Sequence, residues 1–443
     1  MGATIVTVET SLIRKVRGRL LPFLVMLYFA AFIDRVNVSF AALTMNRDLG
    51  LNAYAYGLGA GIFFLGYCLF EVPSNLILYR VGARRWIARI MITWSLIGAA
   101  MAFVQGPESF WSLRFLLGVA EAGFFPGIVY YLTRWAPATH RAQMIGTFMA
   151  AIPISTALGA PLSGAILHLD GVFGVAGWRW LFLCEAVPSL LLGVCTWMWL
   201  PDSPAEAKWL TAGEKEWLAR VLEAEAACRD AKYRGPLFRT LTDPRILALS
   251  VCYFGADMGL YGVVLWVPQV LASAGVPESS VIYVVAIPYA LAAIAMIFWS
   301  RHSDRTRERL WHIAGASLLG FAGLAATAYL TDSPRLAVLA VTVGAIGTLA
   351  ILPIFWLLPA AILGGAAAAA GIALINTVGN VGGFAGPYIV GWVKATTGSF
   401  TYGLLVVAGG LLLSGIMVLL IGHDSRSELP ISAAAVTGRG NSG

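Results

Sequence analysis

The chain has 443 residues, of which 59% are hydrophobic and only 12% are charged. Soluble globular domains carry roughly twice that share of charge, so the composition excludes this class and is typical of a protein with many membrane spans. The five cysteines are scattered without CxxC or metal-ligand spacing, and we expect neither a metal site nor a cofactor.

Apolar stretches follow one another along the chain, and a helix that crosses a bilayer needs about 20 such residues. We expect twelve spans, at approximately 20–43, 54–79, 84–104, 109–135, 141–168, 178–200, 244–271, 281–300, 311–330, 335–358, 366–393 and 402–422. This predicts an all-α membrane protein with two six-helix halves, 1–200 and 244–423, joined by a linker at 201–243 and followed by a tail at 424–443. Tryptophan, leucine and charges alternate at helical spacing in Ala205–Ala227, which predicts an amphipathic helix on the membrane surface.

The basic residues predict the orientation. Of the 30 lysines and arginines, 23 fall on the side of the membrane that holds both termini and the linker. Cytoplasmic loops carry this excess, so both termini and the linker are predicted to be cytoplasmic. The net charge of +7 therefore reflects topology, and nucleic-acid binding is not needed to explain it. The basic N-terminus followed by a long, charged apolar run predicts a retained first helix rather than a cleaved signal peptide.

Charges lie inside two of the expected spans. Asp34 and Arg35, with Asn37 beside them, interrupt the first span, and Arg114 and Glu121 interrupt the fourth. A charge at the centre of a span costs about 2.5–3.5 kcal/mol, and such residues usually face a cavity or a partner. The alternative for the first pair is the end of a shorter helix in the headgroups. Seven residues separate Arg114 from Glu121, about 10 Å along a helix, so we expect Arg114 to meet another helix, for example at Asp34.

Two basic turns repeat between the halves, one after the second expected span and one after the eighth. They resemble the G-x-x-x-D-R-x-G-R-R turn of the major facilitator superfamily: Asp304 and Arg305 are present in the second copy, whereas Tyr79 replaces the acid in the first. Further segments resemble the anion:cation symporter family within it. They are IDRVNVSFAA, FEVPSNLIL, RFLLGVAEAGFFPG, LPDSPAEAKWL, YGVVLWVPQVL and AAAAAGIALINTVGNVGGFAGP.

The resemblance implies roles for the buried polar residues. The acids matching Asp34 and Glu121 carry protons in related organic-anion symporters, and the arginine matching Arg35 binds the substrate carboxylate, which suits its planar fork. Tyr67 is implied as a substrate contact. Arg114 is expected to bind substrate. The alternative for both Arg114 and Glu121 is that they lock the helices together or act as a gate.

Other polar residues within the spans could have more than one role. Glu71 is expected to have a gating or structural role. Asn376 and Asn380 share a face of the eleventh span and are expected either to bind substrate hydroxyls or to pack helices. Asp257 falls outside the family pattern, and a substrate hydroxyl contact, a second proton site and a bond to a tyrosine all remain open.

These features predict a proton-coupled symporter, not an enzyme, that imports a small organic anion across a bacterial inner membrane. Sugar acids and tartrate are the expected cargo, and the protein is expected to be a monomer in the bilayer. Protonation of Asp34 and Glu121 would relax their hold on Arg35 and Arg114, the anion would bind, and the halves would rock around it. The alternatives are an anion exchanger or uniporter for aromatic carboxylates such as phthalate, and a membrane anion receptor.

Overall fold

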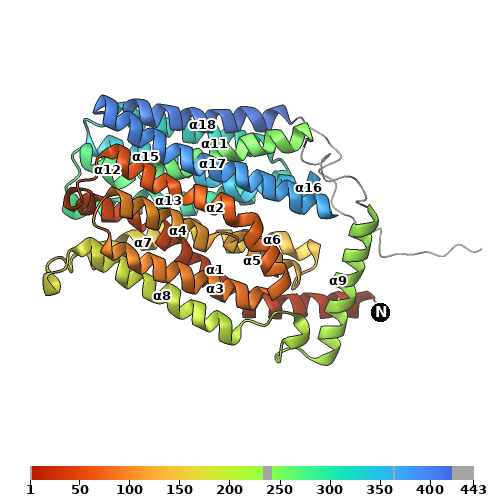
Figure 1. Cartoon of the computed structure of the whole chain (residues 1–443). Coiled ribbons are helices and arrows are strands. Elements are labelled where there is room, and N and C mark those ends of the chain that lie inside the picture. The colour runs from red at the N-terminus through yellow and green to blue at the C-terminus, as the bar shows by residue number, and fades with distance from the viewer. Residues whose placement is uncertain (1, 233–241, 363–364, 422–443) are drawn as a thin grey trace, which may run out of the picture.

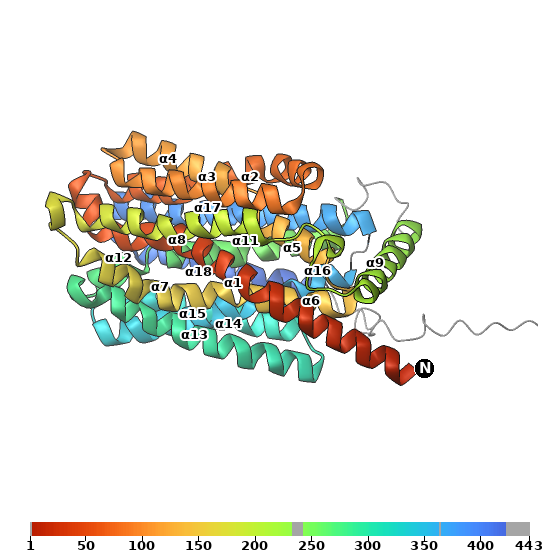
Figure 2. The same cartoon turned by 90° about the horizontal axis from the view of Figure 1, so that it is seen from below.

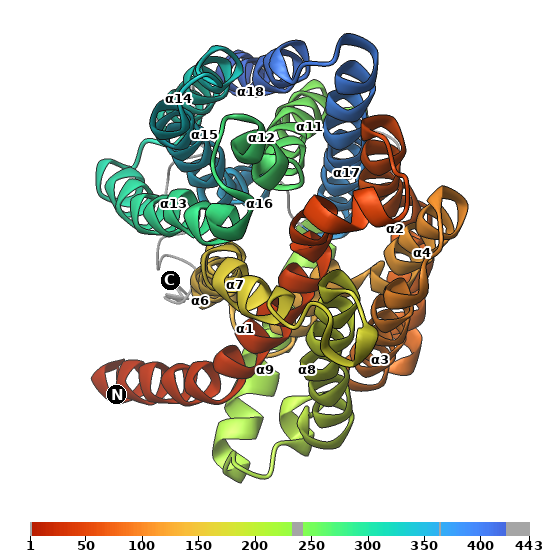
Figure 3. The same ribbon diagram turned by 90° about the vertical axis from the view of Figure 1, so that its left-hand side faces the viewer.

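The computed structural model describes residues 2–232, 242–362 and 365–421, and helices make up nearly all of this part of the chain. Seen along the spans, the molecule consists of two groups of helices, one from each half of the sequence (Figure 3). The first half contains α1 (Gly2–Asp48), α2 (Ala53–Val81), α3 (Ala83–Ala100), α4 (Pro107–Glu121), α5 (Phe124–Thr133), α6 (Ala138–Met149), α7 (Ala151–Leu167) and α8 (Gly177–Trp199).

The second half contains α11 (Pro244–Val264), α12 (Val267–Ser273), α13 (Glu278–Thr306), α14 (Leu310–Tyr329), α15 (Pro334–Phe355), α16 (Leu357–Ile362), α17 (Gly365–Thr397) and α18 (Thr401–Leu420). Eleven segments of the described chain are long and apolar enough to cross a membrane. Helix α17 takes the place of the eleventh expected span and packs between α11 and α2. The predicted all-α fold of twelve spans in two halves is therefore confirmed.

The first helix is much longer than the expected span at 20–43. It begins at Gly2 and ends at Asp48, and its N-terminal part projects beyond the bundle (Figures 1 and 2). The basic segment that contains Arg14, Lys15, Arg17 and Arg19 thus continues the helix instead of forming a separate tail.

Four expected spans are each broken into two helices. The fourth breaks between Glu121, which ends α4, and Phe124, which begins α5. Gly123 has a φ of +84°, which favours glycine, and a Cβ there would lie 2.5 Å from Ser74 Oγ on α2. The fifth breaks at Ala150, between α6 and α7, the seventh between α11 and α12, and the tenth between α15 and α16. Breaks at membrane depth occur where the backbone is buried in protein or lines a cavity.

The two halves are fastened together at the end of the bundle opposite the N-terminus. Tyr56 Oη donates to Leu265 O over 2.7 Å, and Arg47 pairs with Glu278 at 2.7 Å. A Cβ at Gly57 would lie only 2.9 Å from Gly391 Cα, so α2 and α17 pack backbone against backbone. The predicted topology would place this end on the side of the membrane opposite the cytoplasm.

The linker helix α9 (Ala212–Lys232) lies across the other end of the bundle (Figure 1). It begins at Ala212 rather than at Ala205, because Pro204–Glu206 forms a separate 3-10 turn. Leu218 is completely buried, and Lys15 of α1 pairs with Glu214 at 2.8 Å. At least this part of the apolar face of α9 therefore packs on protein. The predicted tail, 424–443, lies outside the described residues.

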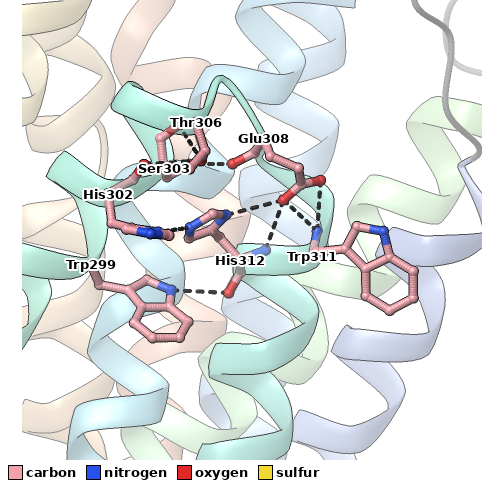
Figure 4. A network of polar contacts seen from close by, with 7 residues as sticks. All are labelled: Trp299, His302, Ser303, Thr306, Glu308, Trp311 and His312. Atoms are coloured by element: carbon pink, nitrogen blue, oxygen red, sulfur yellow. Dashed lines mark hydrogen bonds and ion pairs between the residues drawn. The ribbon is translucent and has the colours of Figure 1, made fainter.

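The turn between α13 and α14 is held by a polar network (Figure 4). Glu308 accepts hydrogen bonds from the backbone N–H groups of Trp311 and His312 at the start of α14, and it contacts His312 Nδ1 at 3.0 Å. The other ring nitrogen of His312 lies 2.7 Å from His302 Nδ1. Partial burial would raise the pKa of Glu308, but these N–H donors and the imidazole outweigh it, and the pKa is lowered.

We expect Glu308→Gln to lower the stability of the protein at neutral pH by about 1 kcal/mol, the size of a lost helix cap. A carboxyl whose pKa is lowered on folding stabilises the folded state above its unfolded pKa, about 4.3, and loses this effect as the pH falls through the folded value. Thermal unfolding in detergent should therefore show a gap between wild type and variant at pH 7 that closes well below pH 4. A gap that persists in acid would contradict this account.

Candidate functional site

A cavity lies between the two halves. It encloses about 430 Å³ of empty space, including space open to solvent. Five of the predicted residues line it: Arg35, Tyr67, Asp257, Asn376 and Asn380. Tyr28, Phe125, Tyr253 and Tyr261 also line it, and none of them was among the predicted site residues.

Arg35 is the centre of this site, and its side chain is almost fully buried. Its Nη2 forms an ion pair with Glu121 Oε1, and its Nη1 donates to Tyr261 Oη of the other half over 2.8 Å. Its buried Nε has no hydrogen-bond partner in the described structure. Glu121 therefore occupies one arm of the guanidinium fork.

Asp34 lies away from the cavity, among helices of the first half. Its Oδ2 accepts hydrogen bonds from Trp94 Nε1 of α3, at 2.9 Å, and from Ser189 Oγ of α8. The expectation that Asp34 holds an arginine is wrong in this conformation. Adjacent residues of a helix point about 100° apart, so Arg35 faces the cavity while Asp34 faces α3 and α8.

Arg114 also differs from its expected position, because it neither meets Asp34 nor lines the cavity. Its Nε donates to Gly59 O at 3.2 Å and its Nη2 to Ala60 O at 3.3 Å, both on α2. Its guanidinium also lies 5.1 Å from the ring centre of Phe63. We correct the expected binding role accordingly: in this conformation Arg114 fastens α4 to α2.

We expect Arg114→Met to lower stability by about 2–4 kcal/mol, since two buried backbone carbonyls lose a charged donor. Thermal unfolding of the purified protein would measure this loss. Arg179→Met is a matched control, because Arg179 also donates to two backbone carbonyls, those of Ala102 and Val104, but is less buried. Its loss should be clearly smaller. Equal losses, or unchanged stability of Arg114→Met with weaker substrate binding, would contradict the structural role.

Glu71 and Asn376 connect the halves on the side of the cavity nearer the N-terminus. Asn376 Nδ2 donates to Glu71 Oε1, and Asn380 Nδ2 donates to the backbone carbonyl of Asn376 over 3.0 Å. The Glu71–Asn376 bond joins the two halves, and a gating role for Glu71 requires a contact of this kind.

Aromatic rings approach one another across the same side of the cavity. Phe125 of α5 and Trp356 at the break between α15 and α16 have ring centres 6.1 Å apart, and Tyr253 stacks on Phe355 at 4.9 Å. Both rings lie at helix breaks: Phe125 is in the first turn of α5, and Trp356 lies between α15 and α16. In the sequence, Gly123 shortly before Phe125 and Pro353 shortly before Trp356 are the residues that could have indicated these two breaks.

The sequence profile of the major facilitator superfamily matches residues 24–387. The chain belongs to the major facilitator superfamily. This membership makes it a membrane transport protein and not an enzyme. A "Putative tartrate transporter" of Agrobacterium vitis is 52% identical over 94% of this chain and 92% of that protein.

Two further comparisons are with another named transporter and with a solved structure. A "Quinolone resistance transporter" of Acinetobacter baumannii is 43% identical over 92% of this chain and 95% of its own length. The structure of a bacterial homologue of the human lysosomal transporter Spinster, inward-facing and occupied, has a TM-score of 0.73. It is 18% identical and covers 91% of this chain and 96% of its own, so it speaks for the fold alone.

Proposed function

We propose that this protein is a proton-coupled symporter that imports a small organic anion across the bacterial inner membrane. The observation that carries the proposal is the buried Arg35 fork, which lies in the cavity between the halves and is held by a carboxylate. A cationic fork that is already matched to a carboxylate suits a carboxylate substrate. The similarity to a protein named as a tartrate transporter supports hydroxylated carboxylates as the cargo.

The geometry suggests how protons and anion are coupled. Glu121 and an incoming carboxylate compete for the same arm of Arg35. A proton on Glu121 removes its charge and frees the fork, so the anion binds most readily to the protonated carrier. Release of the anion lets Glu121 lose its proton and recapture Arg35. Asp34, bound by Trp94 and Ser189 instead of by a cation, is the second proposed proton site.

Rocking of the halves completes the proposed cycle. The Arg35–Tyr261 and Glu71–Asn376 bonds both join the two halves. A substrate that binds in the cavity would therefore contact residues whose bonds must break when the halves move apart. Tyr67, Asn376 and Asn380 line the remaining wall and are proposed to contact the substrate. The carrier is proposed to act as a monomer, with its N-terminus in the cytoplasm.

Uptake by purified protein in liposomes tests this function. Labelled tartrate, sugar acids, phthalate and a neutral sugar are each offered with and without an inward proton gradient. We expect gradient-dependent uptake of a hydroxylated carboxylate that a protonophore abolishes. Uptake that ignores the gradient would instead indicate an exchanger or uniporter, and binding without uptake would indicate a receptor. Selection of the neutral sugar would contradict the role of Arg35.

A further inference from the structure

Asp257 is a carboxyl group on the wall of a cavity that is built to receive an anion. It lies on α11 in the second half, is 3% exposed, and lines the same cavity as Arg35 of the first half. The field of Arg35 acts on it, but Arg35 gives its own hydrogen bonds to Glu121 and Tyr261. When ionised, an acid in this position repels an anionic substrate, and a hydrogen-bond donor on the substrate offsets this cost.

The surroundings of Asp257 hold it toward the cavity. Tyr253, one turn earlier on α11, hydrogen-bonds its side chain. Behind it lies Gly379 of α17, where an added Cβ would lie 3.1 Å from Asp257 Oδ2 and 2.1 Å from the ring of Tyr253. Gly379 is therefore needed for this close approach. Asn376 and Asn380 flank Gly379 on α17 and line the same cavity.

The two sides of the cavity thus have opposite hydrogen-bonding character. Arg35 can only donate, whereas an ionised Asp257 can only accept. A molecule with a carboxylate at one end and hydroxyl groups at the other satisfies both sides at once. An ionised aromatic dicarboxylate has no donor, so it would offer Asp257 no hydrogen bond and would face it with a like charge.

We propose that Asp257 is a specificity-determining residue that accepts a hydrogen bond from a hydroxyl group of the substrate, so that the cargo is a hydroxylated carboxylate rather than a plain or aromatic one. This inference rests on the proposed transport function and names the substrate class of the same cavity. A site built to bind a hydroxyl rejects the analogue that lacks it far more strongly than an apolar pocket rejects a misfit.

The test compares acids that differ only in hydroxyl groups: tartrate, malate and succinate, with phthalate as a fourth. In liposomes the wild type should take up tartrate with a kcat/KM at least about 100-fold above that of succinate. Asp257→Asn should lower the value for tartrate by about 10- to 100-fold and change that for succinate by less than threefold, so that the preference collapses. Equilibrium binding to the detergent-solubilised protein gives the same comparison where uptake is lost.

Glu185→Gln provides the matched control. Glu185 is a buried acid of the first half that accepts from Ser163 Oγ at 2.6 Å and does not line the cavity. Whatever this variant does to rates, its tartrate-to-succinate ratio should equal that of the wild type. Thermal unfolding of both variants shows whether each is folded.

Two outcomes would overturn the inference without touching the proposed function. One is a wild type that takes up carboxylates without regard to their hydroxyl groups. The other is an Asp257→Asn variant that keeps the hydroxyl preference, including one that keeps it while losing its dependence on the proton gradient, which would make Asp257 a proton site. A wild type that transports no carboxylate would instead contradict the proposed function.

Discussion

Arg35→Lys is expected to lower kcat/KM for the anion by at least about 100-fold, although it keeps the positive charge. Lysine has no planar fork and reaches one partner at a time. A hydrogen bond to a charged group contributes about 1.5–3 kcal/mol, or about 10- to 150-fold in binding, and the variant loses the two-point contact with a carboxylate. The partner Glu121 also loses its matched cation, so some loss of stability should accompany the loss of uptake.

Tyr261→Phe is the control for this variant. It removes one hydrogen bond to Arg35 Nη1 and leaves the guanidinium and Glu121 in place. The bond that it removes is a single one to a charged group, at the lower end of the range given above, so a loss of about tenfold in binding is expected, well short of that for Arg35→Lys. Binding titrations on both variants, with unfolding curves beside them, measure these effects. Arg35→Lys with wild-type affinity would refute the role of the fork.

Glu121→Gln is expected to abolish uptake driven by a proton gradient while the exchange of anion across the membrane continues. Glutamine resembles the protonated acid in shape and charge, so Arg35 is permanently available to the substrate. The variant should bind the anion with little dependence on pH, whereas binding to the wild type should weaken as the pH rises and Glu121 recaptures the fork. Counterflow in liposomes measures exchange, and a pH series of binding curves measures the coupling.

Glu185→Gln serves here as well, because it makes the same acid-to-amide change in the same half without touching Arg35. It should keep gradient-driven uptake. Full gradient-driven uptake by Glu121→Gln would exclude Glu121 as the coupling acid. Loss of binding together with loss of uptake would mean that Glu121 only locks the helices.

The fold was largely predictable because each span must be apolar over a fixed length. The breaks in the spans were not, since they depend on how neighbouring helices approach. Gly123 is one glycine among many in the sequence, and only the contact with Ser74 of α2 shows why it must be one. The long first helix was missed for a related reason: charges stop an apolar run but need not stop a helix.

Which residues carry charge within the spans was predictable, but which residues they contact was not. Asp34, Arg35, Arg114 and Glu121 stand out because charge within a span is costly. Their partners depend on the rotation of each helix, which directs Arg35 to Glu121 and Asp34 to Trp94. The partners of Arg114 could not be predicted either, because they are backbone carbonyls, which every residue has. The function of the paired residues remains a prediction.

The pairing of Arg35 with Glu121 has an electrical consequence. Any carrier that returns empty moves its own binding site through the membrane potential, and each unbalanced charge is subject to about 2.3 kcal/mol per 100 mV. An unpaired arginine would be drawn toward the negative side and would resist the return. The ion pair carries no net charge, so in the proposed cycle the membrane voltage would exert no net force on it while the carrier returns empty, and the energy of the gradient would act on the loaded carrier.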